Sequence, residues 1–363
     1  MRKRKLRRRQ YKTTRAIIIF SMCLAFLGIS AGYAAFSTGI VMNIKGNIKE
    51  KAISVSELKT EVVTSGDGLY KDSSEDGRYV YKGINPNNYI KLGDDMYRII
   101  AAESNNTIKV IKYNSIGSMV IDPGYSNFIE GLTLANSNDG TRYSSNKNDY
   151  CYFSDVPTDY FGCNVWGSKY TMLDANENNV TQIRKKIYNN NLYNLPDKEA
   201  YLNTYLNNEW YGSLDYSVSN NIVSHIFNVG HINSSNKETI DEMSFQEQFY
   251  KWRGKVGLVG VLDYIKANLN TSNCSALDDS YVHCSDTSWL KKMNYSVNSQ
   301  FWTISPSSIE GGNHYQWFID SSASYITKNQ AYNNKNVHPV FFLSSKIMLN
   351  GNGTEINPYI LSK

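Results

Sequence analysis

The chain has 363 residues, of which 41% are hydrophobic and 20% are charged. This composition is too apolar for a disordered chain and too polar for a protein with many membrane spans. The formal net charge is +5, but residues 1–15 hold nine Lys and Arg and no acid, so the rest of the chain has 29 basic and 33 acidic residues. A mildly acidic body argues against a nucleic-acid-binding protein.

An uncharged apolar stretch, residues 16–36, directly follows the basic residues 1–15. As a helix it would rise about 32 Å, enough to cross a hydrocarbon core of about 30 Å. We therefore interpret residues 1–15 as a basic cytoplasmic tail and residues 16–38 as a transmembrane signal anchor that contacts the lipid bilayer, with the C-terminal domain extracellular. This predicts a single-pass protein of the cell membrane.

Two alternatives for the apolar stretch stay open. Small residues at Gly32 and Ala34 suit cleavage of a signal peptide after Ala34, which would give a secreted protein. A helix buried in a protein core is the other alternative.

Four of the five cysteines form two local pairs, Cys151/Cys163 and Cys274/Cys284, and Cys23 lies in the apolar stretch. An even number in an exported body predicts two disulfides, with free thiols and metal binding as alternatives. Zinc sites favour C-x₂₋₄-C spacing, which neither pair has. We predict no metal site and no cofactor.

The segments after the apolar stretch predict a mixed architecture. Residues 39–66 are interpreted as a stalk or linker. Short strands over 79–81, 89–92, 96–101 and 107–113 are separated by turns rich in Gly and Asn, and the last three predict an antiparallel meander. A long polar insertion follows over about 114–180.

Further elements are expected in the C-terminal half. Apolar periodicity favours helices over 181–194, 197–209, 238–250 and 261–267, and strands over 221–231, 254–259, 300–304, 314–320, 324–327 and 337–343. The predicted class is α+β: an N-terminal transmembrane helix followed by one domain with antiparallel sheets, two or three helices and long loops.

An ordered series of segments between residues 67 and 361 resembles a family of exported ectodomains from low-GC Gram-positive bacteria, the DUF6273-like group. The segments include Asp67–Tyr70, Asn88–Leu92, Gly254–Leu258, Phe301–Pro306 and Val337–Leu343. That family is similar to the C-type-lectin-like fold, which it shares with formylglycine-generating enzymes. The resemblance implies that residues 67–363 are one extracellular C-type-lectin-like domain, whose termini meet in a small sheet and whose long loops present a binding face.

The sequence departs from both active branches of that fold. The Glu-Pro-Asn or Gln-Pro-Asp and Trp-Asn-Asp motifs of calcium-dependent lectins are absent. Both late cysteines precede Trp302, whereas formylglycine-generating chemistry needs a Cys pair near the C-terminal strands. The resemblance therefore implies neither calcium-dependent sugar binding nor that oxidation chemistry.

No catalytic set is predicted. The five His lack an H-E-x-x-H pattern, and the adjacent carboxylates Asp94-Asp95 and Asp278-Asp279 are interpreted as solvated turns. Trp302 and Trp317 favour core packing. Loop Tyr and Asn residues give large, adaptable contacts, so we predict a ligand-binding face formed by Asn313, Tyr315, Tyr325, Tyr332, Asn333, Asn334 and Asn336.

The sequence thus favours a non-catalytic, membrane-anchored extracellular recognition protein of a bacterial cell surface, with a protein or glycan as its ligand. A cell-envelope hydrolase acting on wall polymers and a structural surface or appendage subunit are the alternatives. Two carboxylates, or a Cys–His pair, that converge in one pocket would favour the enzyme.

Overall fold

The computed structural model describes residues 51–122, 164–168, 170–179, 187–188, 191–192, 199–232, 239–278, 281–284, 288–293, 299–310, 313–322 and 325–362. The chain divides into two units, Met1–Lys51 and Ala52–Lys363. The predicted stalk residues from 52 to 66 fall in the second unit, where Val55 and Leu58 are buried.

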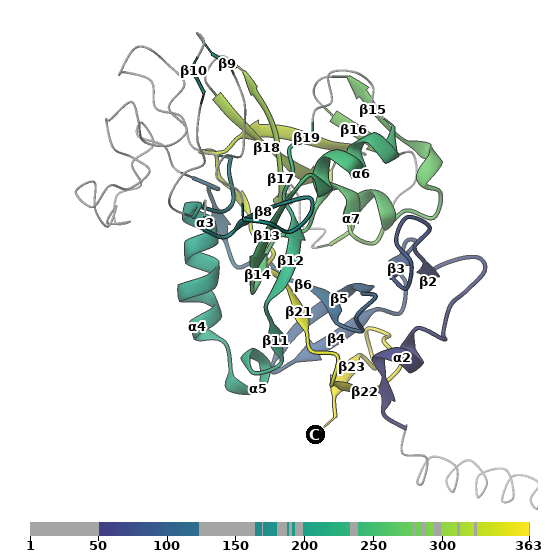
Figure 1. Ribbon diagram of the computed structural model, residues 1–363. Coiled ribbons are helices and arrows are strands. Elements are labelled where there is room, and N and C mark those ends of the chain that lie inside the picture. Colours follow the sequence, from purple (N-terminus) through teal and green to yellow (C-terminus); the bar gives the residue numbers. More distant parts are fainter. Residues whose placement is uncertain are drawn as a thin grey trace, which may run out of the picture. The chain divides into compact units, whose positions relative to one another are not determined.

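An 11-stranded sheet forms one part of the unit (Figure 1). Its main path runs β1 (Ile53–Ser54), β22 (Met348–Asn350), β23 (Tyr359–Leu361), β4 (Tyr89–Leu92), β5 (Asp95–Ala102), β6 (Ile108–Lys112), β21 (Val340–Leu343) and β11 (Ile222–Val223). β14 (Val256–Gly257) pairs with β21, β2 (Gly68–Lys71) with β3 (Tyr79–Lys82), and β3 with β5. The first strand of the unit and its last two strands are therefore neighbours in one sheet.

The predicted meander is confirmed by β4, β5 and β6, which pair antiparallel in chain order. Its tight turn uses Gly93 at φ 60°, a left-handed conformation that costs glycine little. The next turn uses Asn106 at φ 64°, and Asn tolerates this region better than most residues. Local turn chemistry therefore accounts for this part of the sheet.

A second, 7-stranded sheet has the order β15 (Cys274–Asp278), β16 (Tyr281–Cys284), β19 (Tyr325–Gln330), β18 (Asn313–Asp320), β17 (Gln300–Glu310), β20 (Lys335–Asn336) and β7 (Ser118–Met119). A 3-stranded sheet joins β12 (His225–Asn228), β13 (Tyr250–Gly254) and β8 (Met172–Asp174), and β9 (Ile187–Tyr188) pairs with β10 (Asn191–Leu192). Trp302 and Trp317 of the 7-stranded sheet are fully buried in the same core as Val110 and Phe341 of the large sheet.

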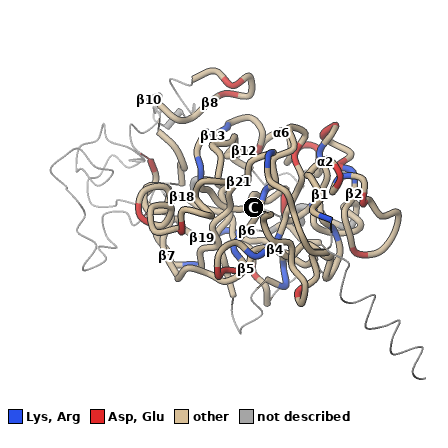
Figure 2. Tube along the Cα trace, turned by 90° about the horizontal axis from the view of Figure 1, so that it is seen from below, with Lys and Arg blue, Asp and Glu red and all other residues tan. Residues whose placement is uncertain are grey.

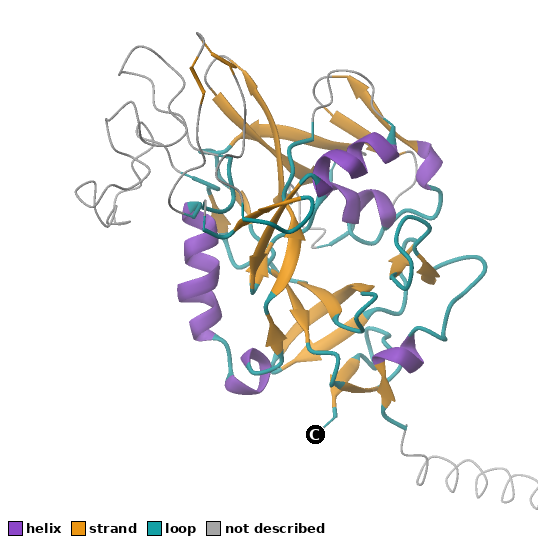
Figure 3. Ribbon diagram, viewed as in Figure 1, coloured by secondary structure: helices purple, strands orange, loops and turns teal. Residues whose placement is uncertain are grey.

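Helices are few and short among the described residues, and Figure 3 shows them at the sides of the strands. They are α2 (Val55–Leu58), α3 (Tyr201–Thr204), the π-helical η1 (Tyr205–Trp210), α4 (Tyr211–Ser213), α5 (Tyr216–Ser219), α6 (Ile240–Gln248), α7 (Val261–Lys266) and the 3₁₀ turn η2 (Thr271–Asn273). The predicted α+β class is therefore wrong, because strands dominate the described chain. The helix predicted over 181–194 is also wrong, since β9 and β10 occupy residues there.

None of the helices in the described ranges is long and apolar enough to span a bilayer. The prediction of a transmembrane helix followed by an α+β domain is thus not supported. Residues 16–38, where that helix was predicted, lie outside the described residues.

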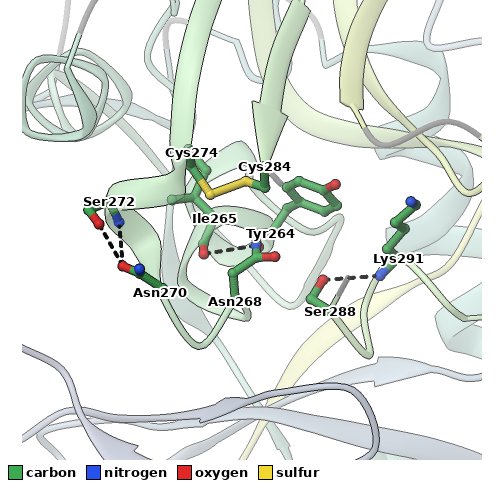
Figure 4. Close-up of a disulfide and its surroundings, with 9 residues drawn as sticks. All are labelled: Tyr264, Ile265, Asn268, Asn270, Ser272, Cys274, Cys284, Ser288 and Lys291. Atoms are coloured by element: carbon green, nitrogen blue, oxygen red, sulfur yellow. Dashed lines mark hydrogen bonds between the residues drawn. A yellow bond between two sulfur atoms is a disulfide. The ribbon is translucent and has the colours of Figure 1, made fainter. Parts of the chain in front are cut away.

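One of the two predicted disulfides is present. Cys274 and Cys284 stand directly opposite each other on β15 and β16, with Cα atoms 4.0 Å apart, and they form a disulfide beside Tyr264 of α7 (Figure 4). Cys151 and Cys163 lie outside the described residues. The bond fixes the outer hairpin of the 7-stranded sheet.

Replacing both cysteines, C274A/C284A, should lower the free energy of unfolding by about 2–3 kcal/mol, because the bond closes a loop with a sequence separation of 10. Urea denaturation of the oxidised full chain measures this change. C23A, which removes a cysteine outside the bonded pair, is the matched control. An unchanged denaturation midpoint in the double variant would contradict the prediction.

Candidate functional site

A cleft of ≈ 770 Å³ opens among the described residues. Its walls come from the segment before β3, the turn between β5 and β6, strands β12 and β13, and the segments around α6 and α7, with single residues of β6, β17, β21 and the turn after β8. Helices α6 and α7 lie side by side at the cleft (Figure 1), and Val261 at the start of α7 donates its amide hydrogen to Glu247 near the end of α6 at 2.9 Å. The cleft thus depends on contacts between segments far apart in sequence.

Arg78 is the centre of a buried ion-pair network at this cleft. Its Nη1 lies 2.6 Å from Asp72 Oδ2, its Nε 2.8 Å from Glu103 Oε2 and its Nη2 3.4 Å from Asp263 Oδ1. Burial would lower the pKa of Arg78, but the three carboxylates outweigh it and raise that pKa. One guanidinium group therefore joins the β2–β3 region, β5 and α7.

Two lysines extend the network. Lys109 Nζ of β6 lies 2.6 Å from Asp263 Oδ2, and Lys266 Nζ of α7 lies 2.8 Å from Asp72 Oδ2. Burial would raise the pKa of both carboxyl groups, but Lys109 and Arg78 lower that of Asp263, and Lys266 and Arg78 lower that of Asp72. Both carboxylates stay ionised. Figure 2 shows acidic and basic residues interspersed along the chain near α6 and β2.

Glu247 is the exceptional group of the cleft. Its side chain is only 3% exposed, and Oε1 accepts hydrogen bonds from the Val261 amide and the Ser305 hydroxyl. Burial, with the charge of Asp263 as a further cause, raises the pKa of Glu247 to about 7. A carboxyl group that titrates near neutrality thus lines the cavity.

Local sequence explains how Glu247 is held. Thr239 and Glu242 form a capping box that begins α6, with the Glu242 carboxylate 2.7 Å from the Thr239 amide. At the other end, Gly230 packs so closely that an added Cβ would lie 1.9 Å from the Gln246 carbonyl oxygen. An added Cβ at Gly260 would lie 2.8 Å from Glu247 Oε1. These two glycines leave the space that Glu247 and its helix occupy.

His225 forms part of one wall. Its ring stacks on Phe342 at 3.8 Å between centroids, and its Nε2 lies 3.3 Å from Asn105 Nδ2. Burial lowers the pKa of His225. A neutral ring that accepts from Asn105 and donates from Nδ1 to the Ile226 carbonyl, 3.1 Å away, satisfies both nitrogens. We therefore assign His225 a packing role in the wall.

The sequence-predicted binding residues do not line this cleft. The structure places Tyr315 of β18 and Tyr332 of the following turn near each other, and Lys328 Nζ lies 5.5 Å from the Tyr315 ring. Asn333 donates to Asn329 at 2.8 Å, Asn334 is exposed in the same turn, and Asn336 lies in β20. Asn313 begins β18, with its side chain outside the described part.

Tyr325 lies away from the other predicted residues. It is opposite His283 at the far end of β19, whereas Tyr315 is opposite Gln330 at the near end. Five residues of strand separate the two ends, which is roughly 17 Å. The structure thus brings Tyr315, Tyr332 and Asn333 to one end of the sheet and leaves Tyr325 at the other.

Among the described residues, no group of three or more His, Cys, Asp or Glu is placed to hold a metal ion. His338 is buried, its Nδ1 lies 2.9 Å from the Lys112 carbonyl, and burial lowers its pKa to about 4.

The charged residues of the cleft were not predicted from the sequence. The two capping signals were available, Thr239-x-x-Glu242 for α6 and Gly260-x-x-Asp263 for α7. They predict where the helices begin, and they do not indicate that Glu247 and Asp263 face one cavity with Arg78. A buried charge near α6 could have been suspected only from Glu247 standing four residues after the buried Met243.

Comparison of the chain with protein-family models, with curated proteins and with solved structures gives no match. The resemblance to exported lectin-like ectodomains therefore stays a prediction from the sequence. The geometry of the cleft carries the functional argument.

The first test of this site concerns Glu247. Between pH about 4.5 and 7 the folded protein holds a proton that the unfolded chain has released, so this group makes stability fall as pH rises through that range. E247Q keeps an acceptor oxygen and removes the titration. The wild type therefore loses stability between pH 4 and pH 8 that E247Q does not lose. The free energy of unfolding of E247Q minus that of the wild type should be roughly 3 kcal/mol larger at pH 8 than at pH 4.

Urea denaturation at both pH values measures this difference, with E209Q as a control at an exposed position. A difference between E247Q and wild type that does not change with pH would contradict the assigned pKa.

The second test concerns Arg78. R78M removes one cation from three buried carboxylates and should lower the free energy of unfolding by about 3–5 kcal/mol. R253M is the control, because the Arg253 side chain is 56% exposed and its ion pair with Glu177 is long, at 3.5 Å. This substitution should change the free energy of unfolding by no more than about 0.5 kcal/mol. If urea denaturation showed equal losses for R78M and R253M, the Arg78 network would contribute no more to stability than an exposed ion pair.

Proposed function

We propose that this chain is an exported recognition protein whose second unit binds an extracellular ligand in the cleft beside α6 and α7. The observation that carries the proposal is the polar cavity of ≈ 770 Å³ with the buried Glu247 carboxyl group, whose pKa is raised to about 7, in its wall. Ligand sites of proteins commonly have about 300–1,000 Å³ and a few placed polar groups. The cleft meets both conditions.

Export is supported by two features of the chain. The basic residues 1–15 followed by the apolar residues 16–36 direct the rest of a chain out of the cytoplasm. The Cys274–Cys284 disulfide is the kind of bond that persists in oxidising compartments. We propose a location at the outer face of the cell membrane, with a secreted form after cleavage near Ala34 as the alternative.

A cell-envelope hydrolase is the second candidate, and the cleft provides a specific reason for it. Glu247 and Asp263 line the same cavity, and their pKa values are shifted in opposite directions. A protonated carboxyl group and an ionised one in one site are the usual acid and base of glycoside hydrolysis. Because the Asp263 oxygens are occupied by Lys109, Arg78 and the Gly260 amide, we favour binding over catalysis.

The test is a binding screen of the full chain against glycans, cell-wall fragments and cell-surface proteins, repeated with two variants. Ser224 is exposed and lines the cleft, so S224W should plug the cavity and weaken binding at least tenfold. S217W places the same side chain on an exposed position of α5 and should bind normally.

Three outcomes separate the candidates. Loss of binding in Y315A/Y332A with normal binding in S224W would move the site to the predicted Tyr and Asn face. Release of fragments from a wall polymer, abolished in E247Q, would establish the hydrolase. No binding by the wild-type chain to any member of the screen would contradict the recognition function.

A further inference from the structure

Strand β12 is an end strand of the 3-stranded sheet, so its outer edge pairs with no other strand among the described residues. Val229, the residue after β12, donates to the Tyr250 carbonyl of β13 at 2.8 Å. Main-chain groups alternate in direction along an antiparallel pair, so Phe227 also faces β13. The main-chain groups of Ile226 and Asn228 therefore face outward, and we call them the open edge of β12.

A second hydrogen bond agrees with this assignment. Arg253, which stands opposite Ile226, turns its amide away from β12 and donates to the Thr171 carbonyl at 3.3 Å. The Ile226 carbonyl accepts from His225 Nδ1 at 3.1 Å and keeps a second lone pair. In the part of the chain that the structure describes, the amides of Ile226 and Asn228 and the Asn228 carbonyl make no hydrogen bond.

The open edge lies inside the cleft. Successive residues of a strand point to opposite faces of its sheet. Phe227 lines the cleft from one face, where its ring lies 5.1 Å from that of Phe342. Ile226 and Asn228 line it from the other face, and so does Lys251, which stands opposite Asn228 on β13. A cavity that reaches both faces passes around the open edge, because β13 and β8 continue the sheet on the other side.

We propose that an extended peptide segment of a partner protein binds in the cleft as an additional strand along the open edge of β12. This inference rests on the proposed recognition function and names its ligand class. Outward-facing amide and carbonyl groups at every second residue match the main chain of a peptide strand, which gains its affinity from main-chain hydrogen bonds.

The surroundings of the open edge favour a single strand as its occupant. Gly230 donates its amide to the Glu247 carbonyl at 2.8 Å, so the edge is closed by α6 just beyond Asn228. An unpaired edge on the surface of a protein pairs readily with another sheet, whereas an edge inside a cleft is shielded from that contact. Acidic and basic residues line the cleft in equal number, so the net charge of the peptide is not what the cleft selects.

The test uses a phage-displayed library of random linear peptides of about 12 residues, selected on the full chain. A selected peptide is synthesised, and each of its residues in turn is N-methylated, which removes one amide donor. Only alternate residues of an added strand turn their amides toward β12. Calorimetry should therefore show binding weakened at least tenfold at every second position along the bound segment and little changed at the positions between.

Variants of the protein locate the contact. N228P removes the outward amide of Asn228, and proline is tolerated on an edge strand where the amide faces away from the neighbouring strand. N228A removes the same side chain and keeps the amide. N228P should bind the selected peptide at least tenfold more weakly than N228A, with thermal denaturation to check that both variants fold. S224W should also weaken binding at least tenfold, because Ser224 lines the same cleft.

Several results would overturn the inference: no peptide selected from the library, N-methylation effects without alternation, equal affinities of folded N228P and N228A, or unchanged peptide binding in S224W. Dimerisation of the full chain that N228P abolishes would also overturn it, because the occupant would then be a second copy of the chain. If N228P does not fold, the N-methylation scan on the wild-type chain decides.

Failure of this inference is distinct from failure of the recognition function. If a glycan binds and S224W blocks it while no peptide binds, recognition stands and the strand-addition inference is wrong.

Discussion

The buried pairing of Arg78 with Asp72, Glu103 and Asp263 is the constraint on which the rest of this unit depends. These partners are 6, 25 and 185 residues from Arg78 in the sequence, so the network forms only when distant segments have come together. Burying such charges is costly unless every one has a partner. The network therefore specifies one arrangement of β3, β5 and α7 and penalises others, and the same arrangement creates the cleft.

Elements with local determinants were predictable from the sequence. The β4–β5–β6 meander follows from alternating apolar residues around the Gly93 turn, and α6 follows from its capping box at Thr239. The helix predicted over 181–194 failed where β9 and β10 lie, because apolar spacing over such a short run does not distinguish a helix from a hairpin. The α+β class failed for a related reason: the expected helices proved short, and long-range strand pairing took most of the described chain.

The predicted ligand-binding residues show even more clearly that the sequence does not reveal which distant residues come together. Tyr315 and Tyr325 are close in sequence and equally suited to ligand contact, yet the register of β18 against β19 places them at opposite ends of the sheet. Glu247 and Arg78 are distant in sequence, and each looks like an ordinary surface charge there, yet both line one cavity. Residue type indicates which chemistry is available, and only the pairing of distant strands and helices decides which groups converge.

Glu247 shows how a stability cost can point to function. The fold supplies two donors to Oε1 and an unsubstituted Gly260 beside the carboxyl group, so the side chain is held firmly in place. A glutamine there would fill the same space without the burden of ionisation near neutral pH. Most residues whose only role is packing avoid such a burden, whereas binding sites accept it because a charged group must be ready before the ligand arrives. A carboxyl group that is rigidly held, buried and shifted to a pKa near neutrality is therefore better explained by a ligand than by the stability of the fold.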